Sequence, residues 1–544
     1  MSDAFKVPVP TNEPIKDYTP NSKEKKSLVA KINELSSTKV EIPIIIDGKE
    51  IKTGNTGNCV KPYDHAHILG TYHKAGEEQV KMAIESSLDA WNDWSQTSFE
   101  FRAKIFLKMA ELLAGPYRDI INASTMLNMS KNAYQAEIDA ACELIDFWNF
   151  NCYYAEEIYK QQPMYSPNGT KNQTEHRPLE GFVFAVTPFN FTSIAANLPS
   201  APALMGNTAI WKPASSTVYP AYFMMKLFKE AGLPDGVINL LPGSGAVVGD
   251  QILSHPKLAG IHFTGSTGVF QSMWKNIGEN IKNYDSYPRI VGETGGKDFC
   301  VAHESCNKEA LATAMTRGAF EFQGQKCSAM SRAYIPSTIW EEVKEIYMSQ
   351  VNELQIGSPE RFSNFLNSVI DKGAFDSITT YIDFAKEADD AEIITGGGYD
   401  DSKGYFIEPT TILTTNPRFK TMEEEIFGPV LTVYIYNPSE WEDTLKLVDT
   451  TSPYALTGAI FCDDKDILKS ANKTLRFSAG NYYINDKPTG AVVGQQPFGG
   501  ARASGTNDKA GSIFNLIRWV SQRTIKENFE PPTDYKYPFM GEDE

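Results

Sequence analysis

The chain has 544 residues, of which 41% are hydrophobic and 22% charged, and its formal net charge is −17 at pH 7. By size it should contain about three domains and bury enough surface to fold without disulfides or structural metals. The acidic charge argues against a general nucleic-acid binder and against binding to anionic membranes. No stretch approaches the roughly 18 consecutive apolar residues that span a bilayer.

The seven cysteines are scattered, odd in number and without a CxxC pair, which disfavours a disulfide framework and a zinc site. The seven histidines show no metal-ligand spacing either, so we expect no metal. The N-terminal residues form neither a secretory signal nor an Arg-rich transit pattern. We therefore expect a cytoplasmic protein that binds neither membranes nor nucleic acid.

The first part of the chain is predicted to be mainly helical. After a Pro-rich start we expect a helix over 21–36, a hairpin over 42–53 that turns at Asp47–Gly48, and amphipathic helices over 80–91 and 101–113. A long helix should run from about 131 to 161, with its aromatic stripe (Phe147, Trp148, Tyr154) packed in the core. The polar stretch 161–178 predicts a loop or a protruding hairpin.

Strands and helices then alternate with short connections. Strands are predicted over 181–186, 207–213, 237–242 and 260–265, and helices over 192–206, 216–232, 246–256 and 267–281. This order indicates a parallel, doubly wound sheet, which binds ligands at the carboxyl ends of its strands. A second alternation follows from about 296 to 480, with helices over 310–322, 340–354 and 444–449.

Two glycine-rich stretches begin predicted helices. GSGAVVG (243–249) misses the G-x-G-x-x-G dinucleotide fingerprint by one residue, so a plain strand–helix turn explains it about as well. FTGSTG (263–268) could bind a pyrophosphate through helix N-terminal N–H groups, or Ser266 could simply cap the helix. Both alternatives stay open on the sequence alone.

Two further stretches carry reactive side chains. Cys327 in FQGQKCSAMSR has small and polar neighbours, which favours a nucleophile over an inert buried thiol. Glu293 in GETGGKD ends a predicted strand before paired glycines, where a carboxylate can activate a water molecule. The alternative for Glu293 is an ordinary surface carboxylate.

Together, TPFNF (187–191), WKPAS (211–215), FTGSTG, GETGGK, GQKCSA and EEIFGPV (424–430) resemble the ordered motif series of the aldehyde dehydrogenase superfamily. AEIDAACELIDFW (136–148) and the stretch over 483–509 are similar to its Δ1-pyrroline-5-carboxylate dehydrogenase branch, in the monofunctional form. The resemblance implies NAD-dependent oxidation of L-glutamate γ-semialdehyde to L-glutamate, the second step of proline degradation.

The resemblance also implies residue roles. Cys327 would attack the aldehyde, Asn190 and the Cys327 N–H would hold the oxyanion, and Glu293 would deprotonate the hydrolytic water. The implied cofactor-binding residues are Thr187, Lys212, Gly265, Ser266, Thr267, Gly268, Val269, Glu425 and Phe427. The implied substrate-binding residues are Glu143 for the ammonium, Ser328, Gly490 and Ala491 for the carboxylate, and Phe191 and Phe498 around the aliphatic stem.

Two assignments keep an alternative. Ser215 follows Lys-Pro-Ala where many NAD-using relatives have Glu, so some use of NADP stays open although NAD is expected. Glu143 could be an exposed helix carboxylate instead of an ammonium partner. Glu137 lies six residues earlier, too far round an α-helix to share its face.

The implied α/β architecture has a doubly wound Rossmann-type NAD-binding domain, an α/β catalytic domain and a small oligomerisation arm. We expect residues 1–160 and 182–294 to form the NAD-binding domain, 295–504 the catalytic domain, and 161–181 with 505–544 the arm of a homodimer or larger oligomer. Eukaryotic relatives work in the mitochondrial matrix. The rival hypotheses are an enzyme of this scaffold with another substrate, a non-catalytic structural protein, and an RNA-associated module.

Overall fold

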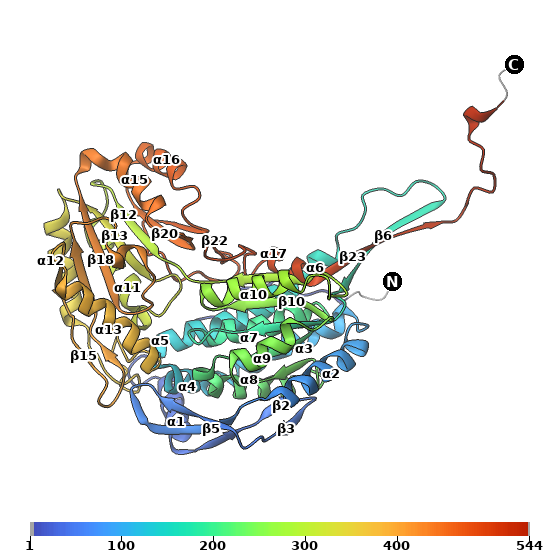
Figure 1. Ribbon diagram of the computed structural model, residues 1–544, viewed down its shortest axis with the longest axis horizontal. Coiled ribbons are helices and arrows are strands. Elements are labelled where there is room, and N and C mark those ends of the chain that lie inside the picture. Colours follow the sequence, from blue (N-terminus) through green and yellow to red (C-terminus); the bar gives the residue numbers. More distant parts are fainter. Residues whose placement is uncertain (1–4, 542–544) are drawn as a thin grey trace.

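The computed structural model describes residues 5–541 and contains two α/β lobes from which a two-stranded ribbon projects (Figure 1). One lobe holds a seven-stranded sheet in the order β11-β10-β7-β8-β9-β2-β3. Its parallel strands are β7 (Phe182–Val186), β8 (Thr208–Lys212), β9 (Ile238–Leu240), β10 (Leu258–Thr264) and β11 (Arg289–Glu293). The connecting helices are α7 (Thr192–Leu204), α8 (Val218–Glu230), α9 (Gly245–Leu253) and α10 (Thr267–Glu279). The predicted strand–helix alternation is confirmed.

The hairpin at the edge of this sheet is also confirmed. Strands β2 (Ile44–Ile46) and β3 (Lys49–Ile51) pair antiparallel. Asp47 and Gly48 between them have φ angles of 53° and 66°, the left-handed pair that a two-residue turn requires. A separate sheet joins β1 (Val40–Ile42), β5 (Asp64–His73) and β4 (Thr56–Lys61).

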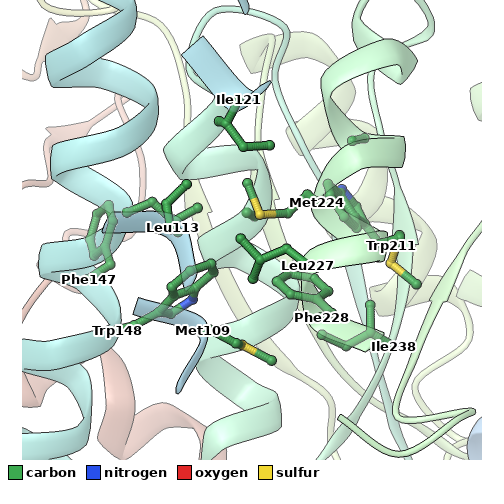
Figure 2. Packing of buried hydrophobic residues seen from close by; sticks show 14 of the residues in the cluster. Met109, Leu113, Ile121, Phe147, Trp148, Trp211, Met224, Leu227, Phe228 and Ile238 are labelled. Atoms are coloured by element: carbon green, nitrogen blue, oxygen red, sulfur yellow. The ribbon is translucent and has the colours of Figure 1, made fainter. Parts of the chain in front are cut away.

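Helices of the N-terminal part pack on the first lobe. They are α1 (Lys23–Ser37), α2 (Glu77–Trp94), α3 (Phe99–Ala114), α4 (Arg118–Met129), α5 (Ala133–Ala136) and α6 (Glu143–Tyr159). Figure 2 shows Met109, Trp148, Leu227 and Phe228 in the core between α3, α6 and α8, all of them buried. Trp148 meets Phe228 edge-on, with 6.0 Å between ring centroids.

The predicted long helix differs from the structure in two respects. It starts at Ala133 instead of residue 131, because Ser130 has a φ of 57° and ends α4 in the left-handed region. A π-helical segment, Glu137–Cys142, also separates α5 from α6. Phe147 and Trp148 are buried as expected, whereas Tyr154 is only half-buried.

The second lobe holds another seven-stranded sheet in the order β14-β17-β18-β13-β12-β20-β21. Its strands are β12 (Asp298–Ala302), β13 (Met330–Pro336), β14 (Ala391–Thr395), β17 (Thr410–Thr414), β18 (Val430–Tyr436), β20 (Thr457–Phe461) and β21 (Asn481–Ile484). Only β14 runs antiparallel to its neighbour in this sheet. Its helices are α11 (Lys308–Phe320), α12 (Trp340–Glu353), α13 (Lys372–Glu387), α15 (Trp441–Thr450) and α16 (Lys465–Thr474). Short elements complete the fold: α14 (Lys420–Glu423), α17 (Ile513–Leu516), β15 (Tyr399–Asp400), β16 (Phe406–Ile407), β19 (Tyr454–Ala455) and β22 (Ala501–Arg502).

The projecting ribbon pairs β6 (Thr170–Pro178) with β23 (Val520–Asn528) (Figure 1). The two strands are antiparallel, with Thr170 opposite Asn528 and Pro178 opposite Val520. Of the two alternatives for 161–178, a hairpin is wrong, because the partner strand comes from the far end of the chain. A loop is found over 161–169 only, before β6 begins. The segment that contains β23 is, however, the other part of the chain expected to form the oligomerisation arm.

Candidate active site

Two cavities meet at Cys327. The inner cavity, of about 770 Å³, is lined by the end of β11, the π-helical segment, α6 and the loop after residue 488. The outer cleft, of about 1910 Å³, runs along the carboxyl ends of β7, β8 and β10 and the start of α10. Cys327, Ile194, Phe263 and Thr264 line both, so the thiol lies at the junction.

A sharp backbone turn delivers Cys327 to this junction. After α11 ends, Phe322, Gln323 and Gly324 have φ angles of 51°, 56° and 65°. Glycine is required at 324 because a Cβ there would overlap the carbonyl oxygen of Gly428. The chain thus reverses between α11 and β13, and Cys327 lies in the loop with 9% of its surface exposed.

The paired glycines after Glu293 let two segments approach the thiol. A Cβ on Gly295 would overlap the Glu425 carboxylate, and one on Gly296 would overlap the carbonyl oxygen of Cys327. Burial, together with the carboxylates of Glu293, Asp298 and Glu425, raises the pKa of Cys327 well above its usual range. Both effects favour the neutral thiol over the thiolate.

Glu293 is placed where it can act as a general base on a water molecule beside the thiol. It ends β11, lines the inner cavity together with Cys327, and is tied by backbone pairing to Gly505. Burial raises the pKa of Glu293 to about 8, while Lys509 opposes the shift and Asp508 adds to it. A carboxylate with a pKa near the working pH suits general-base chemistry. The alternative of an ordinary surface carboxylate is wrong.

Asn190 contacts the loop that carries Cys327, here called the nucleophile loop. Its side chain is 3% exposed, and its Nδ2 donates to the carbonyl oxygen of Gln325 at 3.1 Å. Gln325 is held in turn, because its Oε1 accepts the N–H of Ile370 at 2.9 Å. The amide lines the outer cleft beside Cys327.

All but one of the expected cofactor-binding residues line the outer cleft, namely Thr187, Lys212, Gly265, Ser266, Gly268, Val269, Glu425 and Phe427. The exception is Thr267, whose hydroxyl lies 3.2 Å from that of Tyr454. Ser266 occupies the N-cap position of α10 without a side-chain capping hydrogen bond, so the capping alternative for FTGSTG is wrong. The 243–249 stretch also reaches the cleft, through Gly245, Ala246 and Gly249.

The donor set of this cleft fits a dinucleotide. The N-terminus of α10 opens onto it and provides unpaired N–H groups for a pyrophosphate. Burial lowers the pKa of Lys212, and its Nζ lies 3.3 Å from the Pro213 carbonyl oxygen. Glu425 accepts the N–H of Gly296 at 2.8 Å, and burial raises the pKa of Glu425 to about 7. A lysine and a carboxylate that line the same cleft suit ribose hydroxyls.

The expected substrate-binding residues all line the inner cavity: Glu143, Phe191, Ser328, Gly490, Ala491 and Phe498. Ser328 is buried, with its Oγ 2.8 Å from Oγ1 of Thr489. Glu143 accepts a hydrogen bond from Ser193, and burial raises the pKa of Glu143 to about 8, so it is not an exposed helix carboxylate. Glu137 lies elsewhere, bonded to Arg118 and Tyr18.

Sequence reasoning missed Asp139, Lys326 and Asp508, which also line the inner cavity. Asp139 carried a usable signal, because it precedes Glu143 by four residues and such residues share a helix face. No comparable local pattern singles out Lys326 or Asp508. Among residues 5–541, no three His, Cys, Asp or Glu side chains are grouped to hold a metal ion, and no helix is long and apolar enough to cross a membrane.

Comparison with known proteins agrees with this geometry. A model described as the aldehyde dehydrogenase family matches residues 50–525. The chain belongs to that family. It is 51% identical to the mitochondrial delta-1-pyrroline-5-carboxylate dehydrogenase of Dictyostelium discoideum, over 98% of this chain and 96% of that protein. The human mitochondrial delta-1-pyrroline-5-carboxylate dehydrogenase is 43% identical, over 97% and 94% of the two chains.

A solved structure is similar over its whole length. The crystal structure of the delta-pyrroline-5-carboxylate dehydrogenase from Mycobacterium tuberculosis bound with NAD matches with a TM-score of 0.96 and 50% sequence identity. The match covers 99% of this chain and 100% of that one. The α/β aldehyde dehydrogenase fold expected from the sequence is confirmed.

Proposed function

We propose that this protein is an NAD-dependent dehydrogenase that oxidises L-glutamate γ-semialdehyde, the open form of Δ1-pyrroline-5-carboxylate, to L-glutamate. One observation carries the proposal. A single inner cavity is lined by the thiol of Cys327 and the carboxylate of Glu293 and also by the proposed substrate-binding residues Ser328, Gly490, Ala491 and Glu143. The full-length relatives named for this activity support it.

The reaction follows from the side chains around the thiol. Cys327 attacks the aldehyde carbon and forms a thiohemiacetal. The Asn190 amide and the Cys327 backbone N–H stabilise the oxyanion, which such preorganised donors do most effectively in a dry site. When bound in the outer cleft, NAD accepts a hydride from the substrate carbon. Glu293 then takes a proton from the water that hydrolyses the cysteine thioester.

Substrate choice would rest on contacts between the remaining cavity residues and the two charged groups of the substrate. The substrate carboxylate would accept hydrogen bonds from the Ser328 hydroxyl and from the backbone N–H groups of Gly490 and Ala491. Gly490 has a φ of 93°, a conformation that glycine adopts without strain and that turns this backbone. Glu143 would pair with the ammonium, and Phe191 and Phe498 would enclose the stem.

We also propose the domain division given by the sequence and a homodimer or larger oligomer built through the β6–β23 ribbon. The ribbon has two strands only, and an isolated pair of strands is marginally stable in water. Its outer end continues into exposed Phe529, Tyr535 and Phe539, which a partner subunit would cover. Sedimentation of the full chain and of a chain ending at residue 519 tests this proposal.

For the compartment, the relatives from Dictyostelium discoideum and Homo sapiens are named as mitochondrial. We propose the mitochondrial matrix for a eukaryotic chain of this kind and the cytoplasm for a bacterial one. Cell fractionation with an antibody to the chain tests the assignment.

The decisive experiment for the activity is NADH formation by the purified protein with NAD and Δ1-pyrroline-5-carboxylate. We expect turnover with this substrate at a kcat/KM well above that for propanal, which lacks both charged groups. Turnover with propanal alone would keep the family chemistry and reject the proposed substrate. The same assay with NADP in place of NAD measures how far the protein can use NADP, which Ser215 leaves open.

A further inference from the structure

A buried lysine, Lys131, lies behind the inner cavity. It has no role in the proposed reaction or in the proposed contacts to substrate and cofactor. Lys131 has no exposed surface and follows the left-handed Ser130 between α4 and α5. Its Nζ donates to Oδ2 of Asp139 at 2.6 Å. The same ammonium lies 4.3 Å from the ring centroid of Phe191 and 4.3 Å from that of Phe322. Burying a lysine is costly unless such partners compensate the charge.

The two rings belong to the two segments that carry the proposed chemistry. Phe191 adjoins Asn190, whose amide donates to Gln325 of the nucleophile loop. Phe322 begins the left-handed turn that leads to Cys327. A cation between two aromatic faces attracts both, and the attraction is stronger in a site without water. Lys131 thereby fastens the oxyanion segment to the nucleophile segment.

The third contact extends this link to the substrate-binding helix. Asp139 belongs to the π-helical segment immediately before Glu143, and both carboxylates line the inner cavity. The adjacent residue Ser130 binds the second lobe, because its carbonyl accepts from Gln323 Nε2 at 3.1 Å and its Oγ contacts that of Ser368 at 2.9 Å. The lysine is therefore at a junction where both lobes and three site segments meet.

We infer that Lys131 is a positioning residue, whose ammonium sets the relative placement of the Asn190, Cys327 and Asp139 segments. The inference rests on the proposed function for the roles of Asn190 and Cys327. An error on the order of 1 Å in such a placement can cost about 100-fold in rate. Burial also lowers the pKa of Lys131 to about 8, with Lys326 acting in the same direction and Asp139 and Glu143 opposing it.

The test removes the ion pair without leaving a lone buried charge. The variant is Lys131→Met with Asp139→Asn, and the readout is the single-turnover rate of NADH formation with propanal and with glutamate semialdehyde. We expect a loss on the order of 10- to 100-fold with both aldehydes. The affinity for NAD should not change, because neither residue lines the outer cleft. The single variant Lys131→Arg, with Asp139 unchanged, should keep most of the wild-type rate, since a guanidinium also stacks on aromatic faces.

The chain offers a matched control. Lys61 is also buried, pairs with Glu360 at 2.6 Å and lies 5.5 Å from the Tyr63 ring. Its partners line neither cavity, whereas Asp139 and Phe191, the partners of Lys131, line the inner one. Lys61→Met with Glu360→Gln should keep the wild-type rate even if its melting temperature falls. A wild-type rate in the Lys131 variant overturns the inference, and so does an equal loss in both variants.

Failure of the proposed function would appear differently in this experiment. The wild-type protein would then form NADH with propanal but not with glutamate semialdehyde. Propanal still compares the variants in that case, so the positioning role is judged independently of the substrate assignment.

Discussion

Replacing Ser328 by Ala removes one hydroxyl from the proposed carboxylate site and changes little else. The side chain is 5% exposed, and its Oγ is 2.8 Å from Oγ1 of Thr489. A hydrogen bond to a charged group contributes roughly 1.5–3 kcal/mol, and about 1.4 kcal/mol corresponds to a factor of ten. We therefore expect kcat/KM for glutamate semialdehyde to fall on the order of 10- to 100-fold.

The same substitution should affect propanal much less, because propanal has no carboxylate to accept that bond. NADH formation with each aldehyde measures the two values of kcat/KM, and thermal melting checks the fold. The lost bond to Thr489 is between neutral groups, about 0.5–1.5 kcal/mol, so the shift in melting temperature should be small. Ser331→Ala is a matched control, since Ser331 lies three residues on and lines neither cavity. An equal loss for the two aldehydes would refute the carboxylate role of Ser328.

Four shorter predictions concern the thiol, the base and the cofactor. Cys327→Ala should abolish NADH formation while NAD still binds, as measured by calorimetry. Cys306→Ala should keep NADH formation, because Cys306 is buried outside both cavities. Glu293→Gln should give up to one equivalent of NADH in a rapid burst and then slow turnover; an unchanged steady rate would mean that another group is the base. Because burial raises the pKa of Glu293 to about 8 and the base must be ionised, hydrolysis of the thioester should speed up as pH rises through about 8, and the Gln variant should lose this dependence. Thr267→Val should leave the affinity for NAD unchanged and Lys212→Met should lower it, which titration of both variants with NAD checks.

Local pattern predicted the strand–helix alternation of the first lobe and three helices of the second, α11, α12 and α15, because each such element has its own periodicity in consecutive residues. It named no strand of the second lobe and missed α13 and α16. The strands from β7 to β10 and the helices between them lie within a few residues of their predicted positions. Glu293 follows the same argument, because it ends β11. Cys327 lies between α11 and β13 of the other lobe, so its place beside Glu293 was predicted by the resemblance of the motif series and not by local pattern.

Features set by distant parts of the chain could not be predicted in this way. The partner of β6 is β23, and no local pattern tells a strand which segment it will pair with. The π-helical segment depends on packing around Glu137, which is bonded to Arg118 and Tyr18. The Thr267 hydroxyl lies 3.2 Å from that of Tyr454 in the other lobe, a contact between segments far apart in the chain.

The ribbon can form only after two segments far apart in the chain have both been synthesised. Strand β6 leaves the ribosome long before its partner β23, because the whole second lobe is encoded between them. Just before β23, Trp519 is fully buried against His262, with 4.7 Å between ring centroids, and its carbonyl accepts from Asn207 at 2.9 Å. The first lobe thus lacks a core side chain until the second lobe has been synthesised. A chain truncated just before this point keeps every residue proposed for catalysis but exposes apolar surface, and we expect proteases to degrade it faster than the full chain.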